Sequence, residues 1–584
     1  MHDLSSLAHG FVAQVQQQPI AALIATLLVV CLTTRFVTGR PDQPQTSAYI
    51  LDARTAPSVP YWIPYLGHLP RLALDPDGLL AKLKKLYPAG AFSLDLLGST
   101  HTVVFTPSLT ASLLDQPDNV VDVSHATSHL LQTVFGFSRS IADLALYDTL
   151  LKDLREQYNL FSSKQPLSEM VNSMTDRLRH NVAEFVTFNG SEIDQAHWER
   201  LASATLVEDP KTGEAVVEAD MFELVRNFVA LTANAALLGT DFVENYAEFW
   251  QALWRLDKGV ASLAMDLPAL LPINRAIGAR RARGFLLRYL DEFETAMETA
   301  RNGENPGPQW ADVKNVSPLV QRRVDQVYRK HNVSIKQRSA LDLALVWGLN
   351  ANTNPLIFWL LWRLYSQSTD LLARVRTEIA PFVVLEKPAV GFGAAFGTAT
   401  RIEKIDSEGL LNNCPLLKAS YLETLRLDQD AWSFHSVRED TVVGDREGNK
   451  VFLRAGTFAH AAPHLWHRDA QAYDEPDVWR PERHLKPKAT NEKQEHEQVA
   501  NLDNNLKPYG RVITEGKEQP FIEREVLLFA AAIIAMYDIQ PQAGAPWNLP
   551  KRETTAGAKH PLLPVNVWIR SRPMPSEHEH TIQD

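Results

Sequence analysis

The chain has 584 residues, of which 45% are hydrophobic and 22% are charged, a balance typical of a globular protein with a buried core. Its formal charge of −11, without long runs of like charge, argues against a nucleic-acid-binding protein, so we expect no nucleic-acid partner. Two cysteines are too few for a disulfide framework and suit a reducing compartment.

An uncharged apolar segment lies near the N-terminus. No formally charged residue stands between Asp3 and Arg35, and residues 19–37 approach the roughly 20 apolar residues that span a bilayer. We expect a short tail over residues 1–18 and one transmembrane anchor over residues 19–37. A cleaved signal peptide is the alternative, but the preceding residues carry no Lys or Arg and no clear small-residue cleavage site follows.

The residues after the anchor predict its orientation. Arg35 and Arg40 follow the segment and no Lys or Arg precedes it, which places the rest of the chain on the cytosolic side of a single-pass membrane protein, with the endoplasmic reticulum as the expected membrane. Residues 38–70 contain six prolines, so we expect a proline-rich linker there.

The remaining residues, 71–584, are expected to form one mainly α-helical domain with small β-sheets. Residues 91–98 and 102–106 predict a hairpin that turns at Gly98. Most later segments have helical patterns, for example residues 221–238. Residues 391–398 are rich in Gly and Ala and lack a full dinucleotide fingerprint, which favours a loop.

A helix that is apolar nearly all round begins near Asp342, which predicts burial in a large core. Its middle brings Asn350, Asn352 and Asn354 to a point just before Pro355, where a kink is expected. Buried polar groups cost free energy unless they are paired or used. Asn350 and Asn352 are therefore candidate catalytic, ligand-facing residues; a kink whose polar groups satisfy one another is the alternative.

A short acidic and basic pair lies on a later predicted helix. Glu423 and Arg426 are one helical turn apart on the same face. An Ala-Pro-His-Leu-Trp-His phrase from Ala462 and a Trp-Arg-Pro-Glu-Arg phrase ending at Arg483 follow in order. This order resembles that of the cytochrome P450 family, the haem-thiolate monooxygenases. The resemblance implies that Glu423, Arg426 and Arg483 form a buried structural core, in which loss of one charge is strongly destabilising.

The resemblance extends over residues 60–575 and implies a cytochrome P450 fold preceded by one transmembrane helix. The sequence around Asn352 is similar to that of the branch containing sterol 7α-hydroxylases and prostacyclin synthase. In that branch the usual acid and alcohol pair for dioxygen activation is altered. In many members, a basic residue five before the Asp of a Glu-Asp phrase approaches a haem propionate. Counting back from Asp440 gives His435, with Arg438 nearby; a polar residue at a strand end is the alternative for both.

The haem-ligand loop is where the chain departs from the family. A gapless count from Tyr509 places Gly516 at the position of the ligating cysteine, and Val512 and Glu518 at the positions of two glycines. In the same register, the following helix matches the family pattern at Phe521, Arg524, Glu525, Leu528 and Phe529. A shifted register would place Thr514 at the ligand position and lose that agreement.

No other residue is an obvious replacement ligand. Cys31 lies in the predicted anchor and Cys414 about a hundred residues upstream of the loop. Histidine and tyrosine can ligate haem. Tyr509, however, occupies the aromatic position of the loop, and His467 and His484 belong to other sequence motifs, away from the ligand position. Haem is the cofactor that the resemblance implies, and its cysteine ligand is absent.

We therefore expect a membrane-anchored family member of terpenoid, steroid or polyketide secondary metabolism that lacks the normal monooxygenase reaction. Its pocket would bind a lipophilic small molecule and guide an isomerisation, cyclisation or elimination by orientation and by the amides of Asn350 and Asn352. One alternative is a non-catalytic partner of other biosynthetic enzymes. Another is a haem-dependent monooxygenase with a corrupted ligand loop.

Overall fold

The computed structural model describes residues 19–40, 53–266, 273–386, 400–430, 432–444, 448–487, 497–499, 517–553, 555 and 558–572. The chain divides into two compact units: Met1–Ala126 with Trp432–Asp469, termed the β unit, and Thr127–Ala431 with Ala470–Asp584, termed the helical unit. Each unit has hydrophobic clusters of its own. The expectation of one domain over residues 71–584 stays a prediction.

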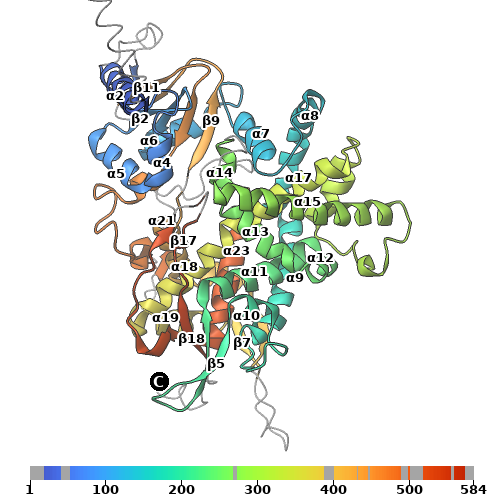
Figure 1. The fold of residues 1–584 in the computed structure, drawn as a ribbon. Coiled ribbons are helices and arrows are strands. Elements are labelled where there is room, and N and C mark those ends of the chain that lie inside the picture. Colours follow the sequence, from blue (N-terminus) through green and yellow to red (C-terminus); the bar gives the residue numbers. More distant parts are fainter. Residues whose placement is uncertain are drawn as a thin grey trace, which may run out of the picture. The chain divides into compact units, whose positions relative to one another are not determined.

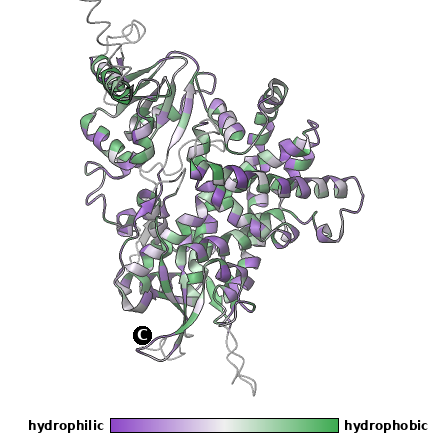
Figure 2. Ribbon diagram, viewed as in Figure 1, coloured by the Kyte–Doolittle hydropathy of each residue, from purple (hydrophilic) through white to green (hydrophobic). Residues whose placement is uncertain are grey.

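The first described helix, α2 (Pro19–Thr38), belongs to the β unit. It is apolar along its length (Figure 2), and large side chains such as Ile20 and Phe36 are exposed. The expected helix is thus present, and it is a candidate single membrane span. Its C-terminal end contacts the proline-rich segment, because the guanidinium of Arg35 lies 5.5 Å from the ring centre of Trp62.

The β unit is built on a five-stranded sheet in the order β2, β3, β12, β9, β4. β2 and β3 form the predicted hairpin, and Gly98 at its turn has a φ of +78°, which favours glycine. β12 runs parallel to β3 and antiparallel to β9. The elements of this unit are β1 (Arg54–Thr55), α4 (Leu69–Leu74), α5 (Pro76–Leu86), β2 (Ala91–Leu96), β3 (Ser99–Val104), α6 (Pro107–Leu114), β4 (Val121–Asp122), β9 (Ser433–Val437), β10 (Thr441–Gly444), β11 (Lys450–Leu453), β12 (Phe458–Ala461) and α22 (His464–His467).

Nearly all helices of the helical unit contribute to the largest hydrophobic cluster. Figure 1 shows these helices packed against one another. The first half of the unit, after α7 (Ser124–Thr133), which begins in the β unit, contains α8 (Ile141–Gln157), η1 (Tyr158–Phe161), α9 (Lys164–Asn181), η2 (Val182–Glu184), α10 (His197–Leu201), β5 (Thr205–Glu208), β6 (Ala215–Asp220), α11 (Met221–Leu238), α12 (Thr240–Asn245), α13 (Glu248–Asp257), α14 (Val260–Ala264), α15 (Asn274–Arg301), η3 (Pro308–Trp310), α16 (Pro318–Arg322) and η4 (Arg323–Tyr328).

Its second half contains α17 (Ile335–Ala351), α18 (Thr353–Ser366), α19 (Thr369–Ile379), β7 (Val383–Leu385), β8 (Ile402–Ile405), α20 (Ser407–Asn413), α21 (Pro415–Asp428), η5 (Pro481–His484), β13 (Leu485–Pro487), β14 (Glu497–Val499), α23 (Gln519–Met536), β15 (Tyr537–Pro541), η6 (Gln542–Gly544), β16 (Arg552–Glu553), β17 (His560–Pro561) and β18 (Asn566–Ser571). β15, β18, β6 and β5 form a four-stranded sheet. Although α11 is long and apolar enough to cross a membrane, 94% of its apolar window is buried, so it is a core helix.

The long helix predicted near Asp342 is present and is broken as expected. At the start of α17 the side-chain oxygen of Gln337 accepts the backbone N–H of Ser334 at 2.9 Å, as in a capping box. α17 ends at Ala351, and α18 starts at Thr353 after the single residue Asn352, so that Pro355 falls in the first turn of α18, where its missing N–H costs little. α18 packs against α11, α21 and α23.

Candidate functional site

The acidic and basic core predicted from the sequence forms within the helical unit. Glu423, on α21, accepts hydrogen bonds from Arg426 Nε at 2.9 Å and Nη2 at 2.8 Å, and from Arg483 Nε at 2.9 Å. His484 Nε2 lies 2.9 Å from the second carboxylate oxygen, and the backbone N–H of Arg480 also donates to Glu423. The structure therefore brings together all three residues of the expected core.

The Glu423 carboxylate is ionised in this setting. It has no exposed surface, and burial by itself would raise its pKa. The hydrogen bonds from Arg426 and His484 outweigh burial and lower the pKa of Glu423 to about 2. The cluster is a paired structural anchor between α21 and η5.

One face of α17 is open in the C-terminal half of the helix, where the other residues are buried. Ala344, Trp347 and Asn352 are half-buried and Gly348 is exposed, whereas residues 349–351 are buried. The spacing of these four residues puts them on one helical face. A side chain added at Gly348 would meet no atom within 4 Å. We call Ala344, Trp347, Gly348 and Asn352 the open stripe.

The two candidate asparagines lie in different surroundings. Asn352 is at the break between α17 and α18, and its Oδ1 accepts the backbone N–H of Ala558 at 2.9 Å. Asn350 is 2% exposed and forms a reciprocal amide pair with Asn234 of α11, with N···O distances of 2.8 and 3.1 Å. Its Nδ2 also donates to the carbonyl of Val346. The structure places Asn352 on the open stripe and Asn350 in the core, and the catalytic role of both stays a prediction.

A buried polar group stands behind the open stripe. The indole N–H of Trp347 donates to Asp257 Oδ1 at 2.8 Å, and Asp257 Oδ2 lies 3.6 Å from His560 Nε2 without a hydrogen-bond partner. Burial raises the pKa of Asp257 to about 6 and lowers that of His560 to about 3, so the imidazole is neutral at neutral pH. Asp257 thus fixes the indole of Trp347 in the wall of the stripe.

The buried guanidinium of Arg226 acts on the Asp257 carboxylate. Arg226 of α11 is 4% exposed, and its guanidinium carbon lies 4.9 Å from the ring centre of Phe222 and 4.8 Å from that of Trp254. It pairs with Glu223, and its positive charge helps to hold down the pKa of Asp257. The sequence analysis did not single out Arg226, Asp257 or His560, because they come from three separate elements and carry no motif.

The two residues proposed near a haem propionate belong to the β unit. His435, on β9, is buried, and its Nε2 lies 2.9 Å from Ser433 Oγ. Arg438 donates to Asp122 Oδ2 at 2.9 and 2.5 Å, and its side chain is 54% exposed. His435 and Arg438 thus lie in the β unit and Glu423 in the helical unit, and the cofactor role of His435 and Arg438 stays a prediction.

Gly516, the position of the expected ligand, lies outside the described residues. The cysteine nearest to that loop in sequence, Cys414, is fully buried before α21, and its Sγ lies 3.5 Å from the carbonyl of Glu378. Burial, followed by the Glu378 carboxylate, raises the pKa of the Cys414 thiol to about 12. Cys31 lies in α2. Neither cysteine belongs to the loop around Gly516, so the residues of that loop do not supply the thiolate that the implied cofactor needs.

Comparison with known proteins is consistent with this architecture. The family model described as Cytochrome P450 matches residues 398–500. Cytochrome P450 7B1 from Mus musculus is 22% identical over 89% of this chain and 91% of its own length. Prostacyclin synthase from Bos taurus is 23% identical over 82% of the chain and 86% of its own length. The fungal cytochrome P450 monooxygenase nodJ from Hypoxylon pulicicidum is 20% identical over 89% and 90%, respectively.

Proposed function

We propose that this chain, which belongs to the cytochrome P450 family and to its sterol 7α-hydroxylase and prostacyclin synthase branch, binds a lipophilic metabolite along the open stripe of α17 and transforms it without oxidation. The reaction class is an isomerisation, cyclisation or elimination. The expected metabolites are terpenoids, steroids or polyketides of secondary metabolism. The open stripe is the observation on which this proposal depends.

The stripe has the surface that a lipophilic ligand needs. An indole, a methyl group and a glycine face the open side, and a single amide stands at the end. Binding sites for apolar molecules combine such surface with few polar groups that fix orientation. The names of several relatives denote enzymes that act on sterols or make a prostanoid, which supports a ligand of this class.

The proposed chemistry follows from the residues that the stripe holds. Asn352 Oδ1 accepts a hydrogen bond from the Ala558 N–H, so the Nδ2 of Asn352 is the donor that can orient a ligand oxygen. Trp347, held by Asp257, supplies a rigid apolar wall that restricts the ligand to a reactive conformation. We propose that the chain lacks the haem thiolate, because neither of its cysteines fits that role, and no step of the reaction is assigned to haem.

The test replaces residues of the stripe and compares metabolites. We expect Gly348→Leu to fill the open side and Asn352→Leu to remove the orienting amide, each lowering product formation by about 100-fold. The measurement is the metabolite profile of the producing strain after gene replacement, together with the haem content of the purified protein. Gly278→Leu on α15 is the matched control, because that glycine is also exposed with no atom within 4 Å of an added side chain.

The outcomes separate the proposal from its alternatives. Unchanged product in both variants would contradict a ligand on the stripe. Unchanged product together with an enzyme that co-purifies with the chain would instead favour a non-catalytic partner of that enzyme. Product formation only by haem-containing preparations would favour a monooxygenase.

The proposed location is the endoplasmic reticulum, with α2 as the anchor and the two units on the cytosolic side. The basic Arg35 and Arg40 at the C-terminal end of α2 support this orientation. In sealed, right-side-out microsomes we expect added protease to digest the units. Full protection of both units would show the opposite orientation.

A further inference from the structure

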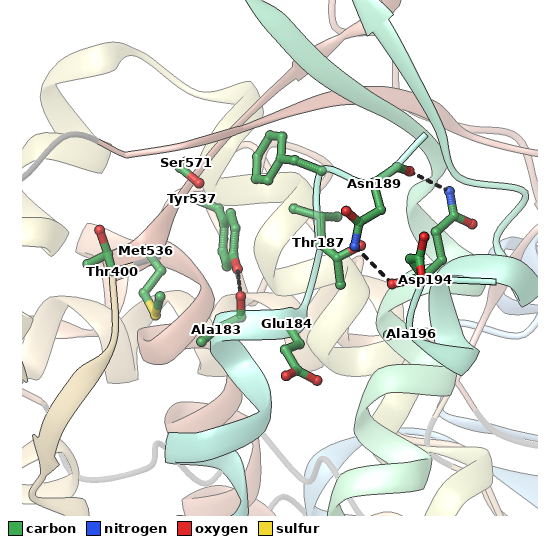
Figure 3. Close-up of a pocket in the computed structure, with 13 residues that line it drawn as sticks. Ala183, Glu184, Thr187, Asn189, Asp194, Ala196, Thr400, Met536, Tyr537 and Ser571 are labelled. Atoms are coloured by element: carbon green, nitrogen blue, oxygen red, sulfur yellow. Dashed lines mark hydrogen bonds between the residues drawn. The ribbon is translucent and has the colours of Figure 1, made fainter. Parts of the chain in front are cut away.

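A hollow of about 390 Å³ lies away from the open stripe, between η2 and the start of β15 (Figure 3). Tyr537 OH donates to the carbonyl of Ala183 at 3.2 Å, and Asn189 Nδ2 donates to that of Asp194 at 2.9 Å. The carboxylates of Glu184 and Asp194 are exposed, so bulk water solvates them. A carboxyl buried between α15 and α17 of the same unit has no such access to water.

This carboxyl is Glu294 of α15. Its side chain has no exposed surface, and among the described residues neither of its oxygens has a hydrogen-bond partner. An ionised carboxylate at this position would lose its hydration without a replacement, at a large cost in free energy. The neutral acid loses much less and carries one O–H donor. Burial therefore favours the protonated form of Glu294.

The neighbouring cations are engaged by other carboxylates. Arg323 of η4 donates to Asp342 Oδ1 from Nη2 at 2.9 Å and from Nε at 3.2 Å. Arg338 of α17 donates from Nη1 to Glu298 Oε2 at 2.7 Å. The same Nη1 lies 3.6 Å from Glu294 Oε2, which is too far for a hydrogen bond. Each guanidinium thus has a carboxylate at hydrogen-bonding distance, and that carboxylate is not Glu294.

The side chain that faces Glu294 is another acid, Asp342 of α17. Burial, followed by the charge of Asp342, raises the pKa of Glu294 well above its ordinary value. Asp342 Oδ1 also accepts the hydroxyl of Tyr328 at 2.5 Å, so Asp342 is the carboxylate of the pair. A proton on Glu294 replaces the repulsion between two acceptors with an O–H···O bond from an acid to a carboxylate.

Other charged groups around the pair act in the opposite direction or on other partners. The positive charges of Arg338 and Arg323 lower the pKa of Glu294, but less than burial and Asp342 raise it. The groups that act on other partners are Asp291, Glu298, Arg329, Tyr158 and, on α13, Glu248. The contact between α15 and α17 therefore depends on the proton of Glu294.

We propose that Glu294 shares its proton with Asp342 at neutral pH, and that this proton makes the packing of α15 against α17 sensitive to alkaline pH. Loss of the proton leaves two carboxylates in contact within the core, where like charges repel strongly. The two helices then separate more readily. The inference is independent of the function proposed for the stripe, although α17 carries both features.

The test compares urea unfolding of the full-length wild-type protein and Glu294→Gln in detergent, at steps from about pH 5 to about pH 9. The glutamine amide can donate to Asp342 as the acid does, but it cannot ionise. The unfolded chain ionises Glu294 above about pH 4.5, so this acid stabilises the fold fully below that pH and progressively less as the pH rises. We expect the unfolding constant of wild type, divided by that of Glu294→Gln, to rise about tenfold per pH unit while the folded acid keeps its proton.

The matched control is Glu298→Gln, about one turn further along α15, which removes a carboxylate that is paired with Arg338. Its unfolding constant should keep the wild-type dependence on pH. Buried Glu525, whose pKa burial raises to about 8, contributes equally to wild type and variants and cancels in the ratio.

Hydrogen exchange of the wild-type protein tests the helix contact without any variant. After correction for the chemical rate, exchange in α15 and α17 should accelerate at least about tenfold between pH 7 and pH 9, relative to that in α11. A constant ratio of unfolding constants, the same loss of pH dependence in Glu298→Gln, or equal acceleration in α11, α15 and α17 would each overturn the proposal.

Discussion

Replacing Glu423 with alanine is expected to destabilise the helical unit by about 3–5 kcal/mol, which is the cost of leaving buried charges without their partner. Arg426 has 1% exposed surface and both of its bonds to the carboxylate would be lost. Arg483 and the backbone N–H of Arg480 would lose an acceptor at the same time. The measurement is the urea midpoint of the detergent-solubilised protein, followed by circular dichroism.

A matched control comes from the same cluster of helices. Glu482 lies one residue before Arg483, and its side chain is 44% exposed and 3.7 Å from the exposed Arg374. An exposed pair of this kind contributes about 0–1 kcal/mol, so Glu482→Ala should leave the midpoint nearly unchanged. Equal midpoints for Glu423→Ala and Glu482→Ala would contradict the role assigned to the core.

The same carboxylate gives the stability of the wild-type protein a defined dependence on pH. The pKa of Glu423 falls from the ordinary 4.5 to about 2 in the folded chain. Because the pKa of this carboxyl is lower in the folded than in the unfolded chain, its ionised form stabilises the fold above pH 4.5. This stabilisation is lost as the pH falls toward 2. We expect the free energy of unfolding to fall by about 3 kcal/mol over this range from Glu423 alone, measured by urea titrations at stepwise pH.

The features predictable from the sequence are those whose cause is local. Pro355 after three asparagines predicts a break in a long helix, and the structure has the break at Asn352. Glu423 and Arg426 are three residues apart, so helical geometry alone brings them together. Arg483 required the order of motifs as well, because its contact with Glu423 spans 60 residues.

The features that sequence could not supply depend on partners far apart in the chain. Asn350 is satisfied by Asn234, 116 residues away, on a helix whose sequence is mainly apolar. Trp347 meets Asp257 across 90 residues. Whether a polar group in a core faces a ligand or another side chain is decided by such contacts, and periodicity shows only that the group is buried.

The absorbance spectrum of the reduced protein with carbon monoxide is expected to lack a thiolate-type Soret band entirely, even after expression with ample haem. A thiolate must donate to the iron for that band and for cleavage of the dioxygen bond. Cys414 lies about a hundred residues before the loop, is fully buried, and its Sγ contacts the carbonyl of Glu378. The remaining cysteine, Cys31, lies in the apolar helix α2.

Gly516→Cys provides the informative comparison, because a gapless count puts that residue at the ligand position of the family. A thiolate band in Gly516→Cys, and none in wild type or in Cys414→Ser, would show that the pocket still accepts haem and that the loss of one side chain removed the ligand. A thiolate band in the wild-type protein would contradict the proposed non-oxidative function. Absence of haem from both proteins would show that other substitutions of the loop, such as Val512 and Glu518 at glycine positions, also exclude the cofactor.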